Sequence, residues 1–430
     1  MSGAVHIGIA GLGTVGAGTV RILQQHAGLL AERCGRKLLI AGVSAHSKNK
    51  QRDCDISGIA WFDDPVDMAQ AAGIDLVVEV IGGAQGVAHH MVEAALKSGK
   101  PVVTANKALV ATHGLALAKL SERHNATLAF EAAVCGGIPV IKALRDGLAS
   151  NRVSSIRGIL NATTNVLLTN MAEKKQDLGA VMDEAAKLGL LEADPSLDVD
   201  GHDAAQKLAI LSALAFGCAP DVASVYREGI RAVTLRDIDY AGRLGYGVKL
   251  LAIATYGPNG LMQRVHPCLL PLESYLARVK GALNTVMLRG DAAGDVVLQG
   301  LGGGEGPTAS AVVSDIIDIA RGGQYKPFTL PTDALKPVAA QSFESSVRSY
   351  YLRLAVEDRA GVLATVTELL RQHNISVRTF LQEDHPDGEL AELVLTTHDT
   401  GEAAMRKALA ALEKQDTVKE PAHMIRIEQP

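Results

Sequence analysis

The first third of the chain alternates short apolar runs with segments of helical pattern. Helix-like segments such as residues 15–25 separate the apolar runs, which cover residues 5–10, 37–44, 75–82, 101–106 and 127–132. Strands that alternate with helices are typical of a parallel sheet with helices on both faces. We therefore predict an α/β fold whose first domain, residues 1–135, is a doubly wound parallel sheet completed by a helix at 307–322.

The hydrophobic pattern changes twice in the rest of the chain. Residues 136–306 mix strands with long helical segments such as 177–189 and 203–217. A loop-like linker follows at 323–347, and residues 348–430 then show the order βαββαβ. These patterns predict an α+β domain in the middle of the chain, for substrate binding and dimerisation, and a small separate C-terminal domain.

Composition and charge exclude several classes of function. The 430 residues contain 42 basic and 47 acidic side chains, a net charge of −5, which gives no electrostatic reason to expect a nucleic acid or an anionic membrane as partner. The five cysteines are odd in number and scattered, as expected of reduced thiols. No apolar run approaches the roughly 18 residues of a membrane span, and the N-terminus leads directly into a strand. We expect a soluble, cytoplasmic protein without a membrane or nucleic-acid partner.

A glycine-rich motif, Gly11-x-Gly13-x-x-Gly16, directly follows the first predicted strand and opens the first helix. Glycines permit a tight turn and a close approach of the backbone to a pyrophosphate at the helix N-terminus. The strand-to-helix context favours dinucleotide binding, by these glycines with Thr14 and Val15, over a merely structural turn. The first domain is then expected to be of the Rossmann type.

The end of the second predicted strand bears on the choice of cofactor. An acidic residue usually holds the ribose of NAD there, but none follows Val43, and His46 and Lys48 occur instead. Basic groups at this place suit the 2′-phosphate of NADP, so we expect NADP to be preferred to NAD. A solvated basic loop that is indifferent to the phosphate is the alternative.

The run from Glu192 to Lys207, EADPSLDVDGHDAAQK, places five carboxylates ahead of one lysine. Asp203 and Lys207 are four residues apart, so on a helix they share a face and the carboxylate can orient the ammonium group. The residues after Lys207 are almost continuously apolar, which indicates the mouth of a buried helix; an ordinary solvated ion pair is the alternative. The cluster suits a small zwitterionic ligand.

Two further candidate sites follow predicted strands. Lys107 lies at the carboxyl end of a parallel strand, where doubly wound sheets bind ligands, although a surface lysine is the commoner case. The segment from Glu131 to Pro139 ends a strand in a glycine pair and leaves backbone carbonyls beside one carboxylate. Such oxygen atoms suit a hard cation, although a plain loop is the alternative interpretation.

Several motifs, taken in order, strongly resemble those of bacterial homoserine dehydrogenase. They are TANKALV around Lys107, FEAAVCGGIP from Phe130, GILNATTN around Asn161, the acidic run that ends at Lys207, and GEGPTASAV around Pro307. The C-terminal βαββαβ unit, with DRAGVLATVTELL, looks like the ACT domain that many of these enzymes carry. The resemblance covers essentially the whole chain.

The resemblance implies an NAD(P)-dependent interconversion of L-homoserine and L-aspartate 4-semialdehyde, on the route to threonine and methionine. By similarity, Lys207 is the proton donor to the aldehyde oxygen, Asp203 lies beside it, and Lys107 is a second lysine near that oxygen. Glu192 is similar to the carboxylate that binds the substrate amino group, and Asp198 belongs to the same cluster. We further expect the neighbouring cation to lower the pKa of Lys207 toward the working pH.

The resemblance also assigns ligands for the cofactor and for a cation. Additional cofactor contacts are expected at Thr104, Lys107 and Gly304. The family's monovalent-cation loop, a structural site for sodium or potassium, corresponds to Glu131, Val134, Gly136 and Ile138. The chain departs from the usual pattern at His46, where an arginine often binds the 2′-phosphate; this departure concerns the cofactor preference and leaves the reaction unaffected.

The ACT-like unit implies regulation by an amino acid. Backbone N–H groups at the helix start near Gly361 can receive a carboxylate, and Asp358 and Asn374 could meet the ammonium group. We expect a homo-oligomer inhibited by L-threonine, with a module that only dimerises the chain as the alternative.

Two other functions fit parts of the sequence. A Rossmann domain with an ACT-like unit would also suit a non-catalytic redox or amino-acid sensor, but a sensor needs no acidic cluster ending in an oriented lysine. A related dehydrogenase for another amino acid or semialdehyde is the second alternative. Glu192 and the two matched lysines argue against it.

Overall fold

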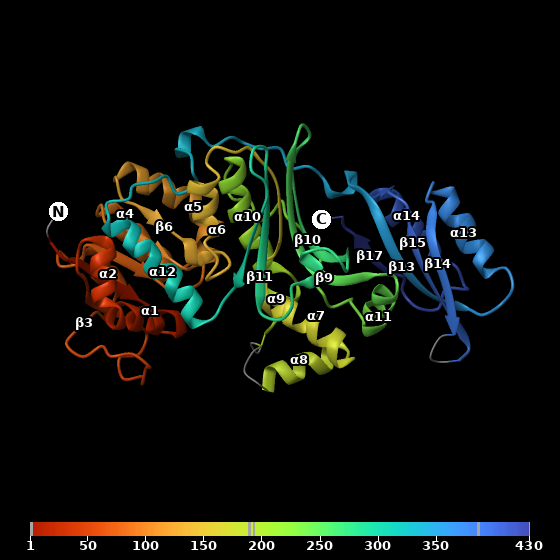
Figure 1. Ribbon diagram of the computed structural model, residues 1–430, viewed down its shortest axis with the longest axis horizontal. Helices are drawn as coiled ribbons and strands as arrows, with labels where there is room; N and C mark the ends of the chain where they lie inside the picture. The colour runs from red at the N-terminus through yellow and green to blue at the C-terminus, as the bar shows by residue number, and fades with distance from the viewer. Residues whose placement is uncertain (1–2, 188–190, 192–193, 385–387, 430) are drawn as a thin grey trace.

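Two β-sheets organise the chain, and helices cover them on both sides (Figure 1). The computed structural model describes residues 3–187, 191, 194–384 and 388–429. Within these residues, every helix is too short or too polar to cross a membrane.

The first sheet has six parallel strands in the order β3-β2-β1-β4-β5-β6. The strands are β1 (Val5–Ala10), β2 (Leu38–Ser44), β3 (Ala60–Trp61), β4 (Leu76–Glu79), β5 (Val102–Thr104) and β6 (Leu128–Ala129). This order reverses direction between β1 and β4, and a ligand of such a sheet binds beyond the carboxyl ends of the strands at that point. The predicted Rossmann-type sheet is confirmed.

Helices pack on both faces of this sheet. They are α1 (Thr14–Gln25), α2 (Ala27–Cys34), α3 (Pro65–Gln70), α4 (Val87–Lys97), α5 (Lys107–Arg123) and α12 (Glu305–Ala320). Helix α12, distant in sequence, lies along α1 (Figure 1), and the two backbones come so close that a Cβ on Gly18 would lie 3.2 Å from the Ala309 Cβ. The helix predicted at 307–322 therefore exists, with Pro307 in its first turn, where proline is well tolerated.

The middle of the chain contributes one end of a larger mixed sheet. Its strands are β7 (Val153–Ile159), β8 (Tyr226–Arg227), β9 (Tyr246–Gly257), β10 (Gly260–Pro271), β11 (Leu283–Gly290) and β12 (Gly294–Leu301). The helices on it are α6 (Val140–Lys142), α7 (Ala162–Lys174), α8 (Leu178–Lys187), α9 (Ser196–Val199), α10 (His202–Phe216) and α11 (Leu235–Arg243). Short 3-10 or π turns lie at Glu131–Ala133, Ala143–Gly147, Leu276–Arg278, Thr332–Ala334 and Phe343–Ser345.

The C-terminal unit has the predicted order βαββαβ. Its elements are β13 (Val347–Glu357), α13 (Val362–Gln372), β14 (Val377–Asp384), β15 (Leu390–Thr397), the short β16 (Thr400–Gly401), α14 (Glu402–Leu412) and β17 (His423–Ile427). The sequence predicted a small separate domain, but β17 pairs in parallel with β10 through Cys268 and Leu269, so one 11-stranded sheet runs through both domains. The edge of β10 is fully buried there, which local periodicity could not reveal.

Candidate active site

Two adjoining cavities lie beyond the carboxyl ends of the parallel strands. The larger, of about 580 Å³, is bordered by the Gly11–Gly13 turn, by the loop after β2, and by Pro65 and Val87. The smaller, of about 320 Å³, reaches from Val15 and Ala105 to Lys107, Lys207 and Gly302. Val80 and Ile81 border both cavities. Together they form a cleft that leads from the first sheet to Lys207 on helix α10.

The glycine motif folds into a turn that only glycine can form. Gly11 has φ +97°, and a Cβ there would lie 2.4 Å from the Val80 carbonyl oxygen. A Cβ on Gly16 would lie 1.9 Å from the Gly11 carbonyl oxygen. Gly13 is the N-cap of α1 and supplies no side-chain cap, so the N–H groups at the start of this helix face the cleft without a competing side chain. Thr14 and Val15 form the first residues of the helix.

The loop after β2 surrounds the larger cavity with polar and basic groups. His46, Ser47, Lys50 and Arg52 line it, whereas the exposed Lys48 contributes its carbonyl oxygen to Arg52. Arg52 also donates to the carbonyl of Lys50 at 2.7 Å and lies 5.6 Å from the Trp61 ring centre. Arg52 was not predicted as a site residue. Its position between the end of β2 and the Trp61 ring marks it as a cavity residue, but this position follows only from the path of the folded loop.

Buried polar residues fix the strand ends at the floor of the cleft. Glu79 accepts hydrogen bonds from the N–H groups of Ile81 (2.8 Å) and Gly82 (3.0 Å), and from the Thr104 hydroxyl. Thr104 in turn accepts from the N–H of Asn106, the N-cap of α5. The Thr104 side chain is wholly buried, so the structure places it behind the cavity wall, while Asn106 and Lys107 line the cavity itself.

Lys207 and Asp203 form an ion pair at the start of α10. The Lys207 Nζ donates to the Asp203 carboxylate at 2.8 Å and to the Leu160 carbonyl at 2.7 Å. The Lys107 Nζ lies 3.2 Å from the other Asp203 oxygen. Asp203 and Lys207 are nearly buried, whereas 40% of the Lys107 side chain is exposed. The structure thus brings together the three residues predicted as catalytic, with Lys107 and Lys207 both lining the smaller cavity.

Burial and charge act against each other in this pair. Burial favours the neutral form of Asp203, but Lys207 and Lys107 outweigh it and lower the pKa of Asp203 to about 2. Burial also favours neutral Lys207, but the attraction of Asp203 prevails and raises its pKa above the usual value. The expectation that Lys107 lowers the pKa of Lys207 is therefore wrong. Lys207 carries a proton at neutral pH and is ready to donate it.

Asn161 connects the pair to the acidic loop. As N-cap of α7, its side-chain oxygen accepts from the Thr164 N–H, which leaves its amide group to donate to Asp198 at 2.6 Å and to Asp203 at 2.8 Å. Asp198 therefore belongs to the same cluster, as predicted. Glu192 lies outside the described residues.

The glycine turn before α12 closes the smaller cavity. Gly302 and Gly303 line it, and Gly304, with φ +95°, is the N-cap of α12. A Cβ on Gly302 would lie 2.1 Å from the Asn284 side chain, which donates at 2.9 Å to the same Leu160 carbonyl that Lys207 contacts. Asn284 was not predicted, because it stands in an ordinary strand pattern.

The predicted cation loop forms a compact turn beside the cleft. Cys135 and Gly136 have positive φ values, and among the described residues no backbone N–H donates to the carbonyl oxygens of Val134 or Gly136. The Glu131 carboxylate accepts from the N–H groups of Ile141 and Lys142, both at 2.9 Å. Burial, and next the charge of Asp315, raise the pKa of Glu131 to about 7. Free carbonyl oxygens beside crowded carboxylates suit a cation chemically.

The predicted effector residues lie on α13 and its ends. Gly361, with φ +91°, is the N-cap of this helix and Asp358 is exposed just before it. Asn374 follows the other end of the helix. Because α13 has 11 residues, at about 1.5 Å each, one small ligand within one chain cannot meet both Gly361 and Asn374.

A cleft with these features defines a class of protein. The glycine turn and helix N-terminus suit a pyrophosphate, the sheet's switch point suits a dinucleotide, and a protonated lysine faces the far end. This arrangement is that of a nicotinamide-dependent dehydrogenase.

Comparison with known proteins narrows the class to a family. The chain matches the family of homoserine dehydrogenase over residues 139–317, the homoserine dehydrogenase NAD-binding domain over 11–131, and the ACT domain over 350–417. A homoserine dehydrogenase of Neisseria gonorrhoeae is 42% identical, with 99% of this chain and 98% of that protein covered. The chain therefore belongs to the homoserine dehydrogenase family and is an oxidoreductase with a C-terminal ACT domain.

Solved structures agree with this assignment. A homoserine dehydrogenase from Thiobacillus denitrificans has a TM-score of 0.93 at 39% identity and covers 100% of this chain, with 99% of its own length matched. A hyperthermophilic archaeal homoserine dehydrogenase in complex with NADPH has a TM-score of 0.63 at 31% identity, covering 74% of this chain and 97% of its own.

Proposed function

We propose that the chain reversibly reduces L-aspartate 4-semialdehyde to L-homoserine with NAD(P)H, on the route to threonine and methionine. The observation that carries this proposal is the buried Lys207 held between Asp203 and the Leu160 carbonyl at the far end of the dinucleotide cleft. A substrate with an ammonium group suits the acidic cluster of Asp198 and its neighbours.

The chain's own residues supply the proton and the orientation. A bound nicotinamide supplies the hydride. Lys207 donates a proton to the aldehyde oxygen as negative charge develops there, and Asp203 holds the Lys207 Nζ in place. Lys107, more exposed and 3.2 Å from Asp203, adds a second positive charge near that oxygen. In the direction of oxidation, deprotonated Lys207 is the general base.

Initial rates of cofactor reduction test the proposal. We expect L-homoserine to be oxidised with a kcat/KM far above that of the analogues that lack its amino group or its carboxylate. Equal activity on the analogue that lacks the amino group would contradict the assignment of the acidic cluster to substrate binding.

NADP is the cofactor we propose as preferred, with NAD as the alternative. The support is the cavity wall of His46, Lys50 and Arg52, which outnumber the one acid of that wall, Asp63, and the absence of an acid from residues 44–52. The archaeal relative was solved with NADPH. His46→Asp should lower the ratio of kcat/KM for NADP to that for NAD by about tenfold, the equivalent of about 1.4 kcal/mol of repulsion. His26→Asp, an equal change at an exposed position of the same domain, is the control, and an unchanged ratio in His46→Asp would refute the role of this loop.

A structural sodium or potassium ion is proposed at the loop of Glu131, Val134, Gly136 and Ile138. The carbonyls of Val134 and Gly136 would be its main ligands, and the ion would balance the charges of Glu131 and Asp315. It would hold the loop against Gly302, whose carbonyl would lie 2.9 Å from a Cβ on Gly136.

Inhibition by L-threonine through the ACT domain and assembly into a homo-oligomer are also proposed. The start of α13 has an N-cap glycine without a side-chain cap, which leaves N–H groups for a carboxylate. The edge strand β12 exposes Val297 and Leu301, an apolar surface that a second copy could cover.

Asp358→Ala should raise the threonine concentration for half-inhibition about tenfold, because the ammonium group loses its charge partner, while kcat without threonine stays unchanged. Asp416→Ala, at an exposed position of the same domain, is the control. Inhibition that stays equally strong and is competitive with homoserine would place the effector at the substrate site instead.

A further inference from the structure

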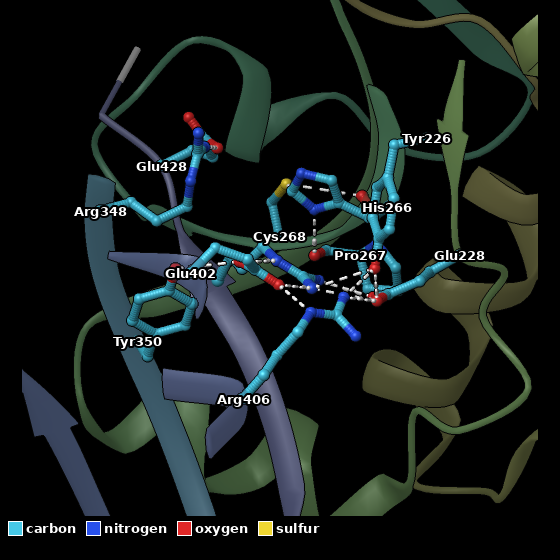
Figure 2. A network of polar contacts seen from close by, with 11 residues as sticks. Tyr226, Glu228, His266, Pro267, Cys268, Arg348, Tyr350, Glu402, Arg406 and Glu428 are labelled. Atoms are coloured by element: carbon cyan, nitrogen blue, oxygen red, sulfur yellow. Dashed lines mark hydrogen bonds and ion pairs between the residues drawn. The ribbon is translucent and has the colours of Figure 1, made fainter. Parts of the chain in front are cut away.

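A buried arginine joins the C-terminal domain to the middle of the chain. Figure 2 shows Glu228 of the middle domain together with Glu402 and Arg406 of the C-terminal domain. Arg426, on β17, is fully buried and donates to Glu228 at 2.6 Å and 3.0 Å and to Glu402 at 2.6 Å and 2.9 Å. Arg406, on α14, also contacts Glu228, at 3.3 Å, and Glu402, at 2.9 Å. Glu402 belongs to the C-terminal domain, so Glu228 is the carboxylate by which the middle domain enters this network. Two guanidinium groups hold it.

Glu228 directly follows the short strand β8 (Tyr226–Arg227), which pairs with β10. Strand β8 pairs with β10 at Arg264 and Val265, and the N–H of Glu228 donates to the Val265 carbonyl at 2.8 Å. The C-terminal domain therefore binds the Glu228 side chain, and β10 binds the Glu228 backbone.

The next two residues touch the backbone of the acidic loop. A Cβ on Gly229 would lie 2.2 Å from the Val199 carbonyl oxygen and 2.6 Å from the Asp200 Cα, so the two backbones are in direct contact. The N–H of Ile230 donates to that same Val199 carbonyl at 2.8 Å. Both Val199 and Ile230 are fully buried. A shift of Glu228 must therefore move the end of α9 or break these contacts.

Helix α9 carries the residue that faces the catalytic pair. Asp198 precedes Val199 and accepts from Asn161, whose amide group also donates to Asp203. Contacts therefore connect Arg426 to Lys207 without a gap. Arg426 pairs with Glu228, the backbone after Glu228 packs on Val199, Asn161 donates to both Asp198 and Asp203, and Asp203 pairs with Lys207.

We infer that Glu228 is a positioning residue for the substrate site: held by Arg426 and Arg406 of the C-terminal domain, it sets the Val199–Asp200 peptide and thereby Asp198 and Asn161. The inference rests on the proposed function because its kinetic readout is homoserine. It assigns the C-terminal domain a part in building the substrate site of the same chain.

A second ion pair between the same two domains provides a matched control. Arg243, on α11, donates to Glu383 on β14, and both side chains are well exposed. This pair links the domains through α11, and within the described part of the chain neither side chain hydrogen-bonds to residues 194–201. Glu228→Gln and Glu383→Gln each remove one carboxylate charge from an interdomain ion pair.

Steady-state kinetics of the full-length variants test the inference. Glu228→Gln should raise the KM for homoserine by about tenfold, with the KM for the cofactor unchanged, whereas Glu383→Gln should leave both unchanged. Arg406→Gln removes only one of the two guanidinium groups at a partly exposed position and should raise the homoserine KM by a smaller factor. If Glu228→Gln does not fold, the homoserine KM of Arg406→Gln still tests the inference. If Glu228→Gln or Arg406→Gln lowers the melting temperature but leaves the homoserine KM as in Glu383→Gln, the positioning role is refuted.

Hydrogen–deuterium exchange separates this inference from the proposed function. Amides of residues 198–203 should exchange faster in Glu228→Gln than in the wild type and in Glu383→Gln. If the wild type fails to oxidise homoserine but the exchange of these amides responds as expected, the proposed substrate is wrong and the contact route stands. If the wild type oxidises homoserine, but Glu228→Gln changes neither the homoserine KM nor the exchange of amides 198–203, only the inference about Glu228 fails.

Discussion

Lys207→Ala is expected to lower kcat for homoserine oxidation by roughly 100-fold or more, since a positioned acid or base contributes about 10² to 10⁴ to the rate. The KM for the cofactor should barely change, because the glycine turn and the loop after β2 lie in the other cavity. Steady-state kinetics at saturating cofactor measure both quantities.

The matched control is Lys280→Ala, which removes an exposed lysine of the same domain that pairs with Glu173. It should keep a kcat close to that of the wild type. Lys207→Ala with near-normal kcat would refute the assignment of the proton donor.

Asp203→Asn should change both the pH profile and the stability. Without the Asp203 charge, burial dominates at Lys207 and its pKa falls, so the rise of kcat for oxidation with pH, which needs neutral Lys207, should move to lower pH. The free energy of unfolding should fall by about 3 to 5 kcal/mol at neutral pH, because Lys207 must then either keep an unpaired buried charge or release its proton. The profile of kcat against pH and chemical denaturation are the measurements.

The stability loss should itself depend on pH. The folded pKa of Asp203 is about 2, below the roughly 3.9 of an unfolded aspartate, so its stabilisation is present above about pH 4 and is lost as the pH falls toward 2. Wild type and Asp203→Asn should therefore converge in stability in acid. A pH profile that does not move, or a difference in stability that persists at pH 2, would show that Asp203 does not set the charge of Lys207.

Local sequence patterns predicted the parts of the site that lie close together in the chain. The glycine turn follows from the motif of Gly11, Gly13 and Gly16, the strand-to-helix step from a change of hydrophobic period, and the pairing of Asp203 with Lys207 from their separation of four residues. The elements that these residues occupy were found where the patterns placed them.

Contacts between distant segments could not be predicted in this way. Asn284 meets the Leu160 carbonyl 124 residues away, and β17 joins β10, although neither strand carries a signal of its partner. The predicted lowering of the Lys207 pKa was also wrong. The pKa is raised because the 2.8 Å contact with Asp203 outweighs burial, and no sequence pattern gives that balance.

The product formed from L-homoserine tests the central claim most directly. Purified full-length protein is mixed with L-homoserine and oxidised NADP, and the product is trapped with a hydrazine and identified by mass spectrometry. The account predicts the hydrazone of aspartate 4-semialdehyde, formed in equal amount to the reduced cofactor, and its near-complete loss in Lys207→Ala. Cofactor reduction without this aldehyde, or no reduction with either NADP or NAD, would contradict the account.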